Sequence, residues 1–310
     1  MSFALAATTI TCVETRPLPP CDPSSALTVP PRDPSAAVVV AAGDIADCPA
    51  GHQDETAALV ERIAPDAVLT LGDTVYPNGS LDDFLDCYGP SWGRFRSITR
   101  PAVGNHDYHA AHAGPFYAYF CGAAGPPFRG YTSFDIGTWH VVVLNSNCGP
   151  DIDLPEGTSD EFGGCGPDSP QAKWLRDDLR AHPNRCTLAM MHHPRFTSSR
   201  YGNHPFVADL WSILYEGGVD VALGGHAHLY ERLAPMTPDG TIDDARGVRS
   251  FVVGTGGRYL VPFGNTVAGS ERRDNESFGV LRLMLRPESA DYAFVAVDGR
   301  VVDEGSFPCH

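Results

Sequence analysis

The segment AVLTLGDTVY at residues 67–76 joins a mainly apolar run to a cluster of polar side chains. The run Ala67–Leu71 predicts a short strand that is buried on both faces. Gly72 then allows a sharp backbone turn, and Asp73 and Tyr76 follow with oxygen atoms that suit a hard metal ion. The segment therefore predicts a buried strand that ends in a functional site.

Apolar runs and helix-like segments alternate from about residue 36 to the C-terminus, which predicts an α/β fold. Further strands are expected at Ala36–Gly43, Trp139–Asn145, Cys186–His192, Val219–Leu223 and Ser250–Val253. Helices are expected at Asp54–Ile63, Pro170–Ala181 and Pro205–Glu216. Near the C-terminus, Gly279–Leu285 and Tyr292–Val302 alternate around the turn Asp298-Gly299, which indicates a closing antiparallel hairpin.

Prolines are dense between residues 11 and 35, which excludes a regular helix and predicts an extended arm pinned to the body. We therefore expect two parts, a proline-rich arm at residues 1–35 and one folded domain at 36–310. Three segments rich in glycine, proline and aromatic residues are expected to be long loops that wall an active site. They span residues 77–100, 108–130 and 147–169.

The formal net charge of −16 gives a field that repels nucleic acid and anionic membranes, so we expect neither as a partner. Lys173 is the single lysine, so bound metal ions would be an economical source of positive charge for a phosphate-bearing ligand. The start, Met1 to Ile10, lacks a basic region and is too short to span a bilayer. We expect neither a targeting segment nor a transmembrane segment in this chain.

Nine scattered cysteines without a CxxC pair favour a secreted, periplasmic or extracellular protein with disulfides. Four bridges would leave one thiol over, and the alternative is a protein of a reducing compartment with buried free cysteines. Cys12 with Cys21, and Cys148 with Cys165, are close enough in sequence to be candidate pairs. Cys48 has a second interpretation, as a soft zinc ligand, although a disulfide is favoured.

Five of the expected strands or segments end in residues that can bind metal. In open α/β sheets the carboxyl ends of strands meet at one crevice, so residues distant in sequence can converge there. Imidazole suits iron, zinc or manganese, and a carboxylate can bridge two ions. The endings are Gly43-Asp44, Gly72-Asp73-Thr74-Val75-Tyr76, Gly104-Asn105-His106-Asp107, His192-His193-Pro194 and Gly224-Gly225-His226-Ala227-His228.

This ordered set of motifs, from Ala36 to about Gly257, resembles the calcineurin-like metallophosphoesterase superfamily, and specifically the purple acid phosphatases. The resemblance implies a four-layer αββα sandwich of two mixed β-sheets, with the metallophosphoesterase catalytic domain at 36–310. It also implies hydrolysis of small phosphomonoesters at a dinuclear metal centre, where metal-activated water attacks phosphorus in line. The additional amino-terminal β domain of the large plant members is not evident.

By position in the motifs, the resemblance implies two ligand sets that share Asp73 as a bridge. Asp44, Asp73, Tyr76 and His228 would hold Fe³⁺, while Asp73, Asn105, His192 and His226 would hold a divalent ion, Fe²⁺, Zn²⁺ or Mn²⁺. A Tyr76 phenolate on ferric iron would absorb visible light and colour the protein purple or pink. The implied catalytic residues are His106 and His204, and Arg195 and Arg200 are candidates to bind the phosphate of the substrate.

Several alternatives stay open at this stage. His193 could replace its neighbour His192 as a ligand, and Asp44 or Asp73 could merely cap a helix. The activity could instead be that of a phosphodiesterase acting on nucleotides or lipid head groups, or the protein could be a secreted metal-binding protein without turnover. Arg232 could orient phosphate or be paired. Five histidines that match no motif are expected on the surface or in the core, with the alternative that His109 or His112 lines the pocket; they are His52, His109, His112, His140 and His182.

The first two motifs also depart from the family pattern. No glycine follows two residues after Asp44, so the turn there is expected to differ. Pro77 pushes Tyr76 toward an extended backbone. The sequence specifies neither the natural substrate nor the oligomeric state.

Overall fold

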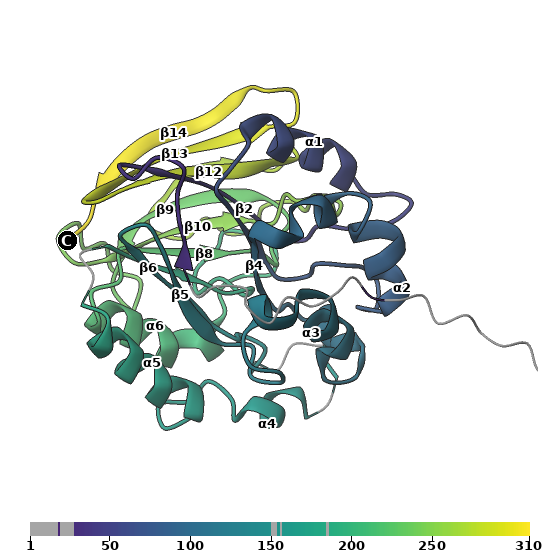
Figure 1. The fold of residues 1–310 in the computed structure, drawn as a ribbon. Coiled ribbons are helices and arrows are strands. Elements are labelled where there is room, and N and C mark those ends of the chain that lie inside the picture. The colour runs from purple at the N-terminus through teal and green to yellow at the C-terminus, as the bar shows by residue number, and fades with distance from the viewer. Residues whose placement is uncertain (1–17, 19–27, 150–153, 156, 184–185) are drawn as a thin grey trace, which may run out of the picture.

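The computed structural model describes residue 18 and residues 28–149, 154–155, 157–183 and 186–310. Two mixed β-sheets stack against each other and carry helices on their outer faces (Figure 1). The expected four-layer α/β sandwich of two mixed sheets is therefore confirmed. Most of the proline-rich arm lies outside the described residues, but its β1 strand (Thr28–Val29) pairs in parallel with β5 (Thr132–Ile136).

The larger sheet has eight strands in the order β1-β5-β6-β7-β8-β10-β9-β11. Its centre is parallel, from β6 through β7 and β8 to β10, and β9 and β11 are antiparallel at one edge. The bounds are β6 Trp139–Val143, β7 Cys186–Met190, β8 Val221–Gly224, β9 Tyr230–Met236, β10 Val248–Val253 and β11 Ser270–Asp274.

The smaller sheet has six strands in the order β14-β13-β12-β2-β3-β4, and β2, β3 and β4 are parallel. The bounds are β2 Ala37–Ala42, β3 Ala67–Leu71, β4 Thr99–Ala102, β12 Gly279–Arg286, β13 Ser289–Ala296 and β14 Val301–Pro308. The prediction of a closing hairpin was incomplete, because three antiparallel strands form a meander. The turn at Asp298-Gly299 joins β13 to β14 and so divides the run expected at Tyr292–Val302.

Helices cover both outer faces of the sandwich. Helix α1 (Gln53–Ile63) contacts β12, and α5 (Pro170–Ala181) and α6 (Ala208–Glu216) contact each other beside the larger sheet (Figure 1). Helix α5 has the predicted bounds, since Ser169 caps it and Pro170 occupies its first turn. The α6 segment differs from the prediction because Pro205–Val207 form a separate 3₁₀ turn.

The three segments expected to be loops contain short helices, so that prediction was wrong in detail. Aromatic residues that looked like loop walls are largely packed inside, including Phe84, Trp92 and Phe116. These helices are α2 (Leu81–Asp83), α3 (Gly114–Phe120) and α4 (Thr158–Phe162), a π-helical turn at Phe84–Tyr88, and 3₁₀ turns at Trp92–Ile98, Asp107–His109, Ala111–Ala113 and Cys121–Ala124.

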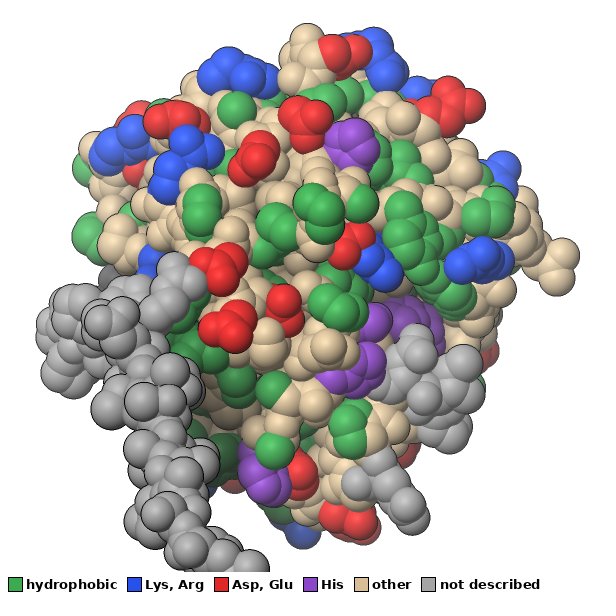
Figure 2. All heavy atoms as spheres, turned by 90° about the vertical axis from the view of Figure 1, so that its right-hand side faces the viewer, with side chains coloured by type: hydrophobic (Ala, Val, Ile, Leu, Met, Phe, Trp, Pro, Cys, Tyr) green, Lys and Arg blue, Asp and Glu red, His purple; other side chains and the backbone are tan. Residues whose placement is uncertain are grey.

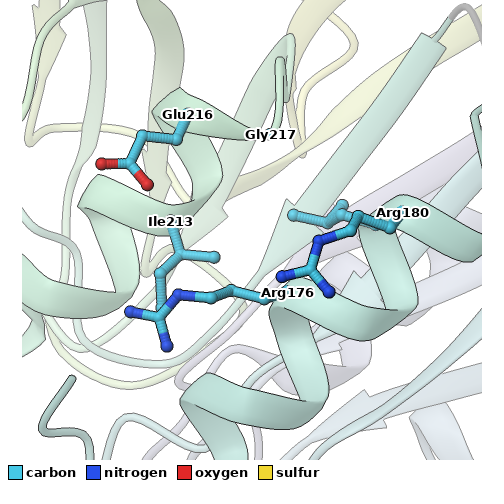
Figure 3. Close-up of a pocket in the computed structure, with 6 residues that line it drawn as sticks. Arg176, Arg180, Ile213, Glu216 and Gly217 are labelled. Carbon is cyan, nitrogen blue, oxygen red and sulfur yellow. The ribbon is translucent and has the colours of Figure 1, made fainter. Parts of the chain in front are cut away.

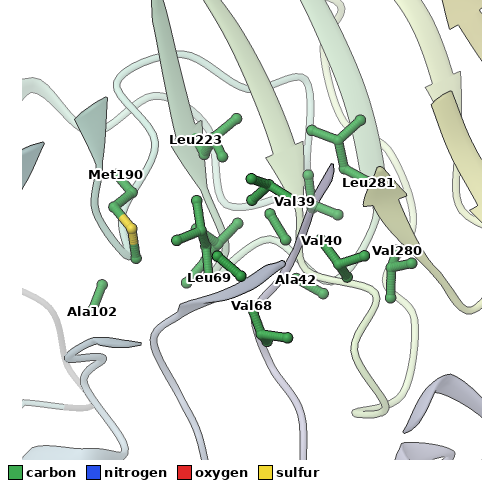
Figure 4. Packing of buried hydrophobic residues seen from close by; sticks show 14 of the residues in the cluster. Val39, Val40, Ala42, Val68, Leu69, Ala102, Met190, Leu223, Val280 and Leu281 are labelled. Atoms are coloured by element: carbon green, nitrogen blue, oxygen red, sulfur yellow. The ribbon is translucent and has the colours of Figure 1, made fainter. Parts of the chain in front are cut away.

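The main hydrophobic core joins the two sheets. Val39 and Leu69 of the smaller sheet belong to the same buried cluster as Met190 and Leu223 of the larger one (Figure 4). Full burial of such a side chain stabilises the fold by roughly 1.5–3 kcal/mol. The two sheets are therefore held in one relative position, which fixes how their strand ends meet.

Three disulfides lie among the described residues, Cys48–Cys87, Cys148–Cys165 and Cys186–Cys309. The expected pairing of Cys148 with Cys165 is confirmed, and Cys48 is a disulfide partner rather than a zinc ligand. Cys121 is also disulfide-bonded, and the expected pairing of Cys12 with Cys21 lies outside the described residues. Disulfides persist in oxidising compartments, so this number of bridges suggests an extracellular location. In the described part of the chain, every helix is too short or too polar to cross a membrane.

His140 forms a buried ionic link between β5, β6 and α5. Its Nδ1 lies 2.9 Å from Asp135 Oδ1 and its Nε2 lies 2.9 Å from Asp178 Oδ2. Burial lowers the pKa of His140, but the hydrogen bonds and charges of the two aspartates outweigh it and raise that pKa. Since both ring nitrogens face carboxylates, the imidazolium form of His140 is the one that links these elements.

We predict that this link makes the stability of the protein depend on pH. His140→Gln should lower the free energy of unfolding by about 2–3 kcal/mol below pH 6. The difference from the wild type should shrink as the pH rises through the raised pKa of His140, because the wild type then loses the charged form. Urea unfolding at several pH values measures this. His52→Gln, at an exposed histidine paired with Glu55, is the control, and a difference that stays constant with pH would contradict the link.

Candidate metal centre

Each of the five predicted motifs follows the carboxyl end of a strand, and the two sheets contribute together. Asp44 follows β2, Asp73 follows β3 and Asn105 follows β4 in the smaller sheet. His192 follows β7, and His226 and His228 follow β8 in the larger sheet. A backbone hydrogen bond joins the first two endings, from Asp44 N to Gly72 O at 3.1 Å, and another joins the first ending to the end of β10 in the larger sheet, from Gly43 N to Val253 O at 2.9 Å. The seven expected ligands, these six and Tyr76, consequently lie in one cluster.

One half of the cluster surrounds the phenol of Tyr76. Its Oη lies 2.9 Å from Asp44 Oδ1 and 2.8 Å from Asp73 Oδ2, and its single proton can bond to either carboxylate. His228 Nε2 lies 3.2 Å from Asp44 Oδ1 and 3.4 Å from Tyr76 Oη. The other ring nitrogen of His228 lies 2.8 Å from the carbonyl of Tyr259, which orients Nε2 toward the cluster.

The other half of the cluster surrounds the amide oxygen of Asn105. This Oδ1 lies 2.9 Å from His192 Nε2 and 3.2 Å from His226 Nδ1. His192 Nε2 is also 3.4 Å from Asp73 Oδ1, while its Nδ1 lies 2.8 Å from the carbonyl of Leu71. Asp73 therefore directs one oxygen to each half, as a bridging carboxylate must.

The cluster is almost closed to water, and its protonation reflects this burial. Asp44, Asp73, Tyr76 and His192 are each at most 1% exposed. Burial, followed by the charges of both aspartates, raises the pKa of Tyr76 well above its usual value. Burial opposes the ionisation of Asp73, but the nearby His192 and His106 keep the pKa of Asp73 well below its usual range. Burial would lower the pKa of His192, but chiefly the charge of Asp73 raises it to about 9.

These donors fit a pair of metal ions. The ion-pair partners that the described residues give Asp44 and Asp73 are histidines, not lysine or arginine. Buried carboxylates need compensating positive charge, and metal ligation requires neutral histidines. Asp44, Asp73 and His192 bring one ligand atom each within 4.8 Å of one another. A mixed set of carboxylate, phenol, amide and imidazole donors suits iron, zinc or manganese.

The backbone of the motifs is strained at the ligands and closely packed at a neighbouring glycine. Asp44, Asp73 and His226 themselves adopt positive φ angles of 60°, 49° and 64°, a strained region for residues with a side chain. Gly104, in the motif that follows β4, is required for a close approach of two backbone segments. A Cβ on Gly104 would fall on the backbone nitrogen and Oδ1 of Asp73, so only glycine allows this close approach.

The departures noted in the sequence leave Asp44 and Tyr76 in the cluster. After Asp44 the chain continues beside the segment that follows β3, with Ala46 N bonded to Thr74 O at 3.1 Å and Tyr76 N bonded to Ala46 O at 2.8 Å. The missing glycine after Asp44 is therefore replaced by an extended run that needs none.

His193 lies behind the ligands rather than beside the carboxylates. Its Nδ1 is 3.0 Å from Ser146 Oγ, and its ring centroid is 4.4 Å from that of His226. Nitrogen atoms of His192, His193 and His226 also come within 4.8 Å of one another, but this second group contains no carboxylate. The geometry favours His192 over His193 as the ligand.

The two candidate catalytic histidines lie on different sides of the cluster. The backbone nitrogen of His106 donates to Asp73 Oδ1 at 2.8 Å, and its ring centroid is 4.4 Å from that of Tyr76. His106 Nδ1 lies 2.8 Å from the carbonyl of Pro77, which leaves Nε2 for a substrate. The ring of His204 is 5.0 Å from that of His226, and its Nδ1 lies 2.8 Å from Pro194 O.

The arginines differ in their relation to the cluster. Arg200 lies over the ring of Tyr201, whose centroid is 5.3 Å from that of His226. Arg195 instead donates to the carbonyl of Pro238 at 3.3 Å and lines a small apolar pocket with Trp211 and Phe251.

The structure also shows the contacts of Arg232 and His109, two residues whose roles the sequence left open. Arg232 pairs with Asp303 at 2.7 Å and with Glu271. For Arg232 the paired alternative is therefore the one observed. His109, expected on the surface or in the core, shares the Pro77 carbonyl with His106.

Two residues that support the site were given no role from the sequence, although one of them, Glu231, lies just after the last motif ending. Arg258 lies 4.5 Å from the ring centroid of Tyr76 and is paired with Asp47. Glu231 is fully buried and accepts hydrogen bonds from Ser198 N at 2.7 Å and from Thr197 Oγ1 at 3.1 Å. Arg258 lies in the segment after β10, immediately after Gly257, where the motifs end. The short sequence Gly256-Gly257-Arg258-Tyr259 after this strand was the one local feature that could have drawn attention to Arg258.

The described residues also form surface features outside the metal-binding cluster. On the face shown in Figure 2, several histidine side chains gather in a patch near arginine and hydrophobic side chains, and other histidines lie apart from this patch. A separate pocket lies between α5 and α6, where Arg176 and Arg180 face Glu216 across Ile213 (Figure 3). It shares no residue with the metal-binding cluster.

A family model for calcineurin-like phosphoesterases matches residues 37–230, which is more than half of the chain. The protein therefore belongs to this family, and the superfamily expected from the five motifs is confirmed.

Its relatives include purple acid phosphatases. Purple acid phosphatase 21 of Arabidopsis thaliana is 28% identical over 222 residues, which cover 63% of this chain and 44% of that protein. An acid phosphatase of Aspergillus ficuum is 32% identical over 134 residues, 40% of this chain and 22% of that protein. The chain thus spans less than half the length of these relatives.

Solved structures share the fold at low identity. A purple acid phosphatase from yellow lupin seeds has a TM-score of 0.71 and 19% identity, covering 90% of this chain and 55% of that one. GAP50, described as the anchor in the inner membrane complex of Plasmodium, has a TM-score of 0.66 and 12% identity, covering 89% and 90%. These likenesses support the architecture of two sheets between helical layers.

We predict that Gly104→Ala disrupts the cluster because the added Cβ would displace Asp73. The free energy of unfolding should fall by about 1–3 kcal/mol, and the variant should bind less metal, as measured by unfolding and metal analysis. Gly114→Ala is the matched control, since a Cβ there meets nothing within 4 Å. Equal metal content in both variants would show that the close approach at Gly104 is unimportant.

Proposed function

We propose that this protein is a metal-dependent phosphomonoesterase that resembles purple acid phosphatases in mechanism. The observation that carries the proposal is the meeting of Asp73 with both halves of the ligand cluster. Two buried carboxylates need compensating positive charge, and among the described residues their ion-pair partners are histidines, which bound metal ions would replace. Family membership and the acid phosphatase relatives support the same reaction class.

Asp44, Tyr76 and His228 would hold a ferric ion together with Asp73, and Asn105, His192 and His226 would hold a divalent ion, Fe²⁺, Zn²⁺ or Mn²⁺, with Asp73. Bound ions would supply positive charge to the phosphate and lower the pKa of water. A trivalent cation among these donors would also reverse the sign of the local field, which otherwise keeps the phenol of Tyr76 protonated.

His106 is proposed to move the proton that the leaving oxygen needs. The Pro77 carbonyl accepts from Nδ1 and so fixes the orientation of the ring, and Nε2 is then the atom that exchanges a proton with the substrate. The hydrogen bond from His106 to Asp73 comes from the backbone nitrogen, so the side chain can be removed without losing that hydrogen bond.

His204 and Arg200 are proposed to contact the substrate on the His226 side of the cluster. His204 is 7% exposed and packs against His226 and Phe206. Arg200 donates a hydrogen bond to the hydroxyl of Tyr201 at 3.3 Å, next to His226. Arg195 lacks this support, because the pocket that it lines contains none of the proposed metal ligands, and His204→Ala should therefore weaken substrate binding more than Arg195→Ala.

The disulfides support a secreted protein, and the net charge of −16 supports a small phosphate ester rather than nucleic acid as substrate. Recovery of the folded protein from a secreted fraction, with its bridges oxidised, tests the first point. Filter binding to duplex DNA at physiological salt tests the second.

The metal-loaded enzyme should hydrolyse p-nitrophenyl phosphate faster than bis-p-nitrophenyl phosphate. His106→Ala should lower kcat for the monoester by about 10²–10⁴ while the metal content stays that of the wild type. His112→Ala, at an exposed histidine paired with Glu161 at 2.9 Å, serves as the control and should retain activity.

Three results would each revise this function. A preference for the diester would indicate a phosphodiesterase. A metal-loaded protein that cleaves neither ester would be a binding protein without turnover. Unchanged kcat in His106→Ala would remove His106 from the mechanism.

A further inference from the structure

Two exposed tyrosines border the cluster on the side of His226 and His228. Tyr201 is 39% exposed and Tyr259 is 51% exposed, and the described residues leave only three other large hydrophobic side chains so open. The ring of Tyr201 lies 5.3 Å from that of His226, and the ring of Tyr259 lies 5.1 Å from that of His228. Two planar apolar surfaces therefore stand next to the place where a phosphate must bind.

The two tyrosines are carried by loops that are hydrogen-bonded to each other. Gly264 N donates to Ser198 O at 2.7 Å, and Arg200 N donates to Pro262 O at 3.3 Å. The carboxylate of Glu231 accepts hydrogen bonds from the backbone nitrogen and the hydroxyl of Ser198, in the loop that carries Tyr201. The backbones of the loops that carry the two rings are thus held in place before any ligand arrives, which lowers the entropic cost of binding.

Each tyrosine is also supported by an arginine. Arg200 lies 5.1 Å from the ring centroid of Tyr201, and Arg258 lies 4.6 Å from that of Tyr259. The charge of Arg258 is already paired with Asp47, so this arginine serves to hold the ring rather than to bind an anion. The remaining surface of each ring faces solvent beside the histidines.

We propose that Tyr201 and Tyr259 form a leaving-group subsite that favours phosphomonoesters carrying a planar aromatic ring. This inference rests on the proposed function and names the substrate class of the same site. A nucleobase and a simple aryl group share the required chemistry, a flat π surface within reach of the phosphate. An aliphatic or sugar phosphate would leave both tyrosines without a partner.

The first test compares adenosine 5′-monophosphate with ribose 5-phosphate, which share the same leaving alkoxide and differ in the base. The wild type should show a kcat/KM at least about ten-fold higher for the nucleotide. Tyr201→Leu and Tyr259→Leu should each reduce this ratio about three- to ten-fold, and Tyr201→Phe should retain it. Tyr215→Leu is the control. Tyr215 belongs to α6 and its ring contacts Arg246, away from the cluster, so this variant should leave the ratio of the two kcat/KM values unchanged.

A second pair, benzyl phosphate and cyclohexylmethyl phosphate, separates stacking from recognition of the base. Preference for the benzyl ester supports stacking. Preference for the nucleotide without preference for the benzyl ester would assign the discrimination to hydrogen bonds of the base and overturn the subsite.

Equal kcat/KM values within both pairs would also overturn the subsite, while the phosphomonoesterase function would stand. If the metal-loaded enzyme cleaves none of the four esters, the proposed function fails. Calorimetry with phenylphosphonate and cyclohexylphosphonate then decides the subsite: tighter binding of the phenyl compound, reduced in Tyr201→Leu, supports it, and equal affinity overturns it.

Discussion

The burial of Asp44 and Asp73 side by side is the constraint on which the rest of the structure depends. Two carboxylates removed from water repel each other and need nearby positive charge. The described residues surround them with histidines, a phenol and an amide. The strained backbone at the ligands and the close approach at Gly104 follow from bringing five strand ends into this small volume.

Two core sheets make that convergence possible. The parallel strands β2, β3 and β4 direct their carboxyl ends to the same edge as β7 and β8 of the other sheet. The shared core, with Leu69 and Leu223 packed in one cluster, fixes the sheets against each other. The ligand cluster therefore inherits its geometry from the most buried part of the fold, while its rim is built from loops.

The sequence predicted the elements whose signals are local. The strand Ala67–Leu71 and helix Pro170–Ala181 were predicted with their observed bounds, because burial on both faces and a capped helix start leave clear patterns. The seven proposed ligands were likewise found together. Strands such as β11 and β14 were missed or incomplete, since edge strands carry exposed polar residues. The contributions of Arg258 and Glu231 depend on contacts between segments distant in sequence, so their roles could not be assigned from the local sequence around them.

Anomalous X-ray scattering from crystals of the metal-loaded protein tests the central claim most directly. Data collected on both sides of the iron absorption edge should show two peaks enclosed by the seven proposed ligands, with iron at the peak nearer Tyr76 and Asp73 between them. A single peak, peaks at another place in the fold, or no iron beside Tyr76 in an active enzyme would contradict the proposed centre.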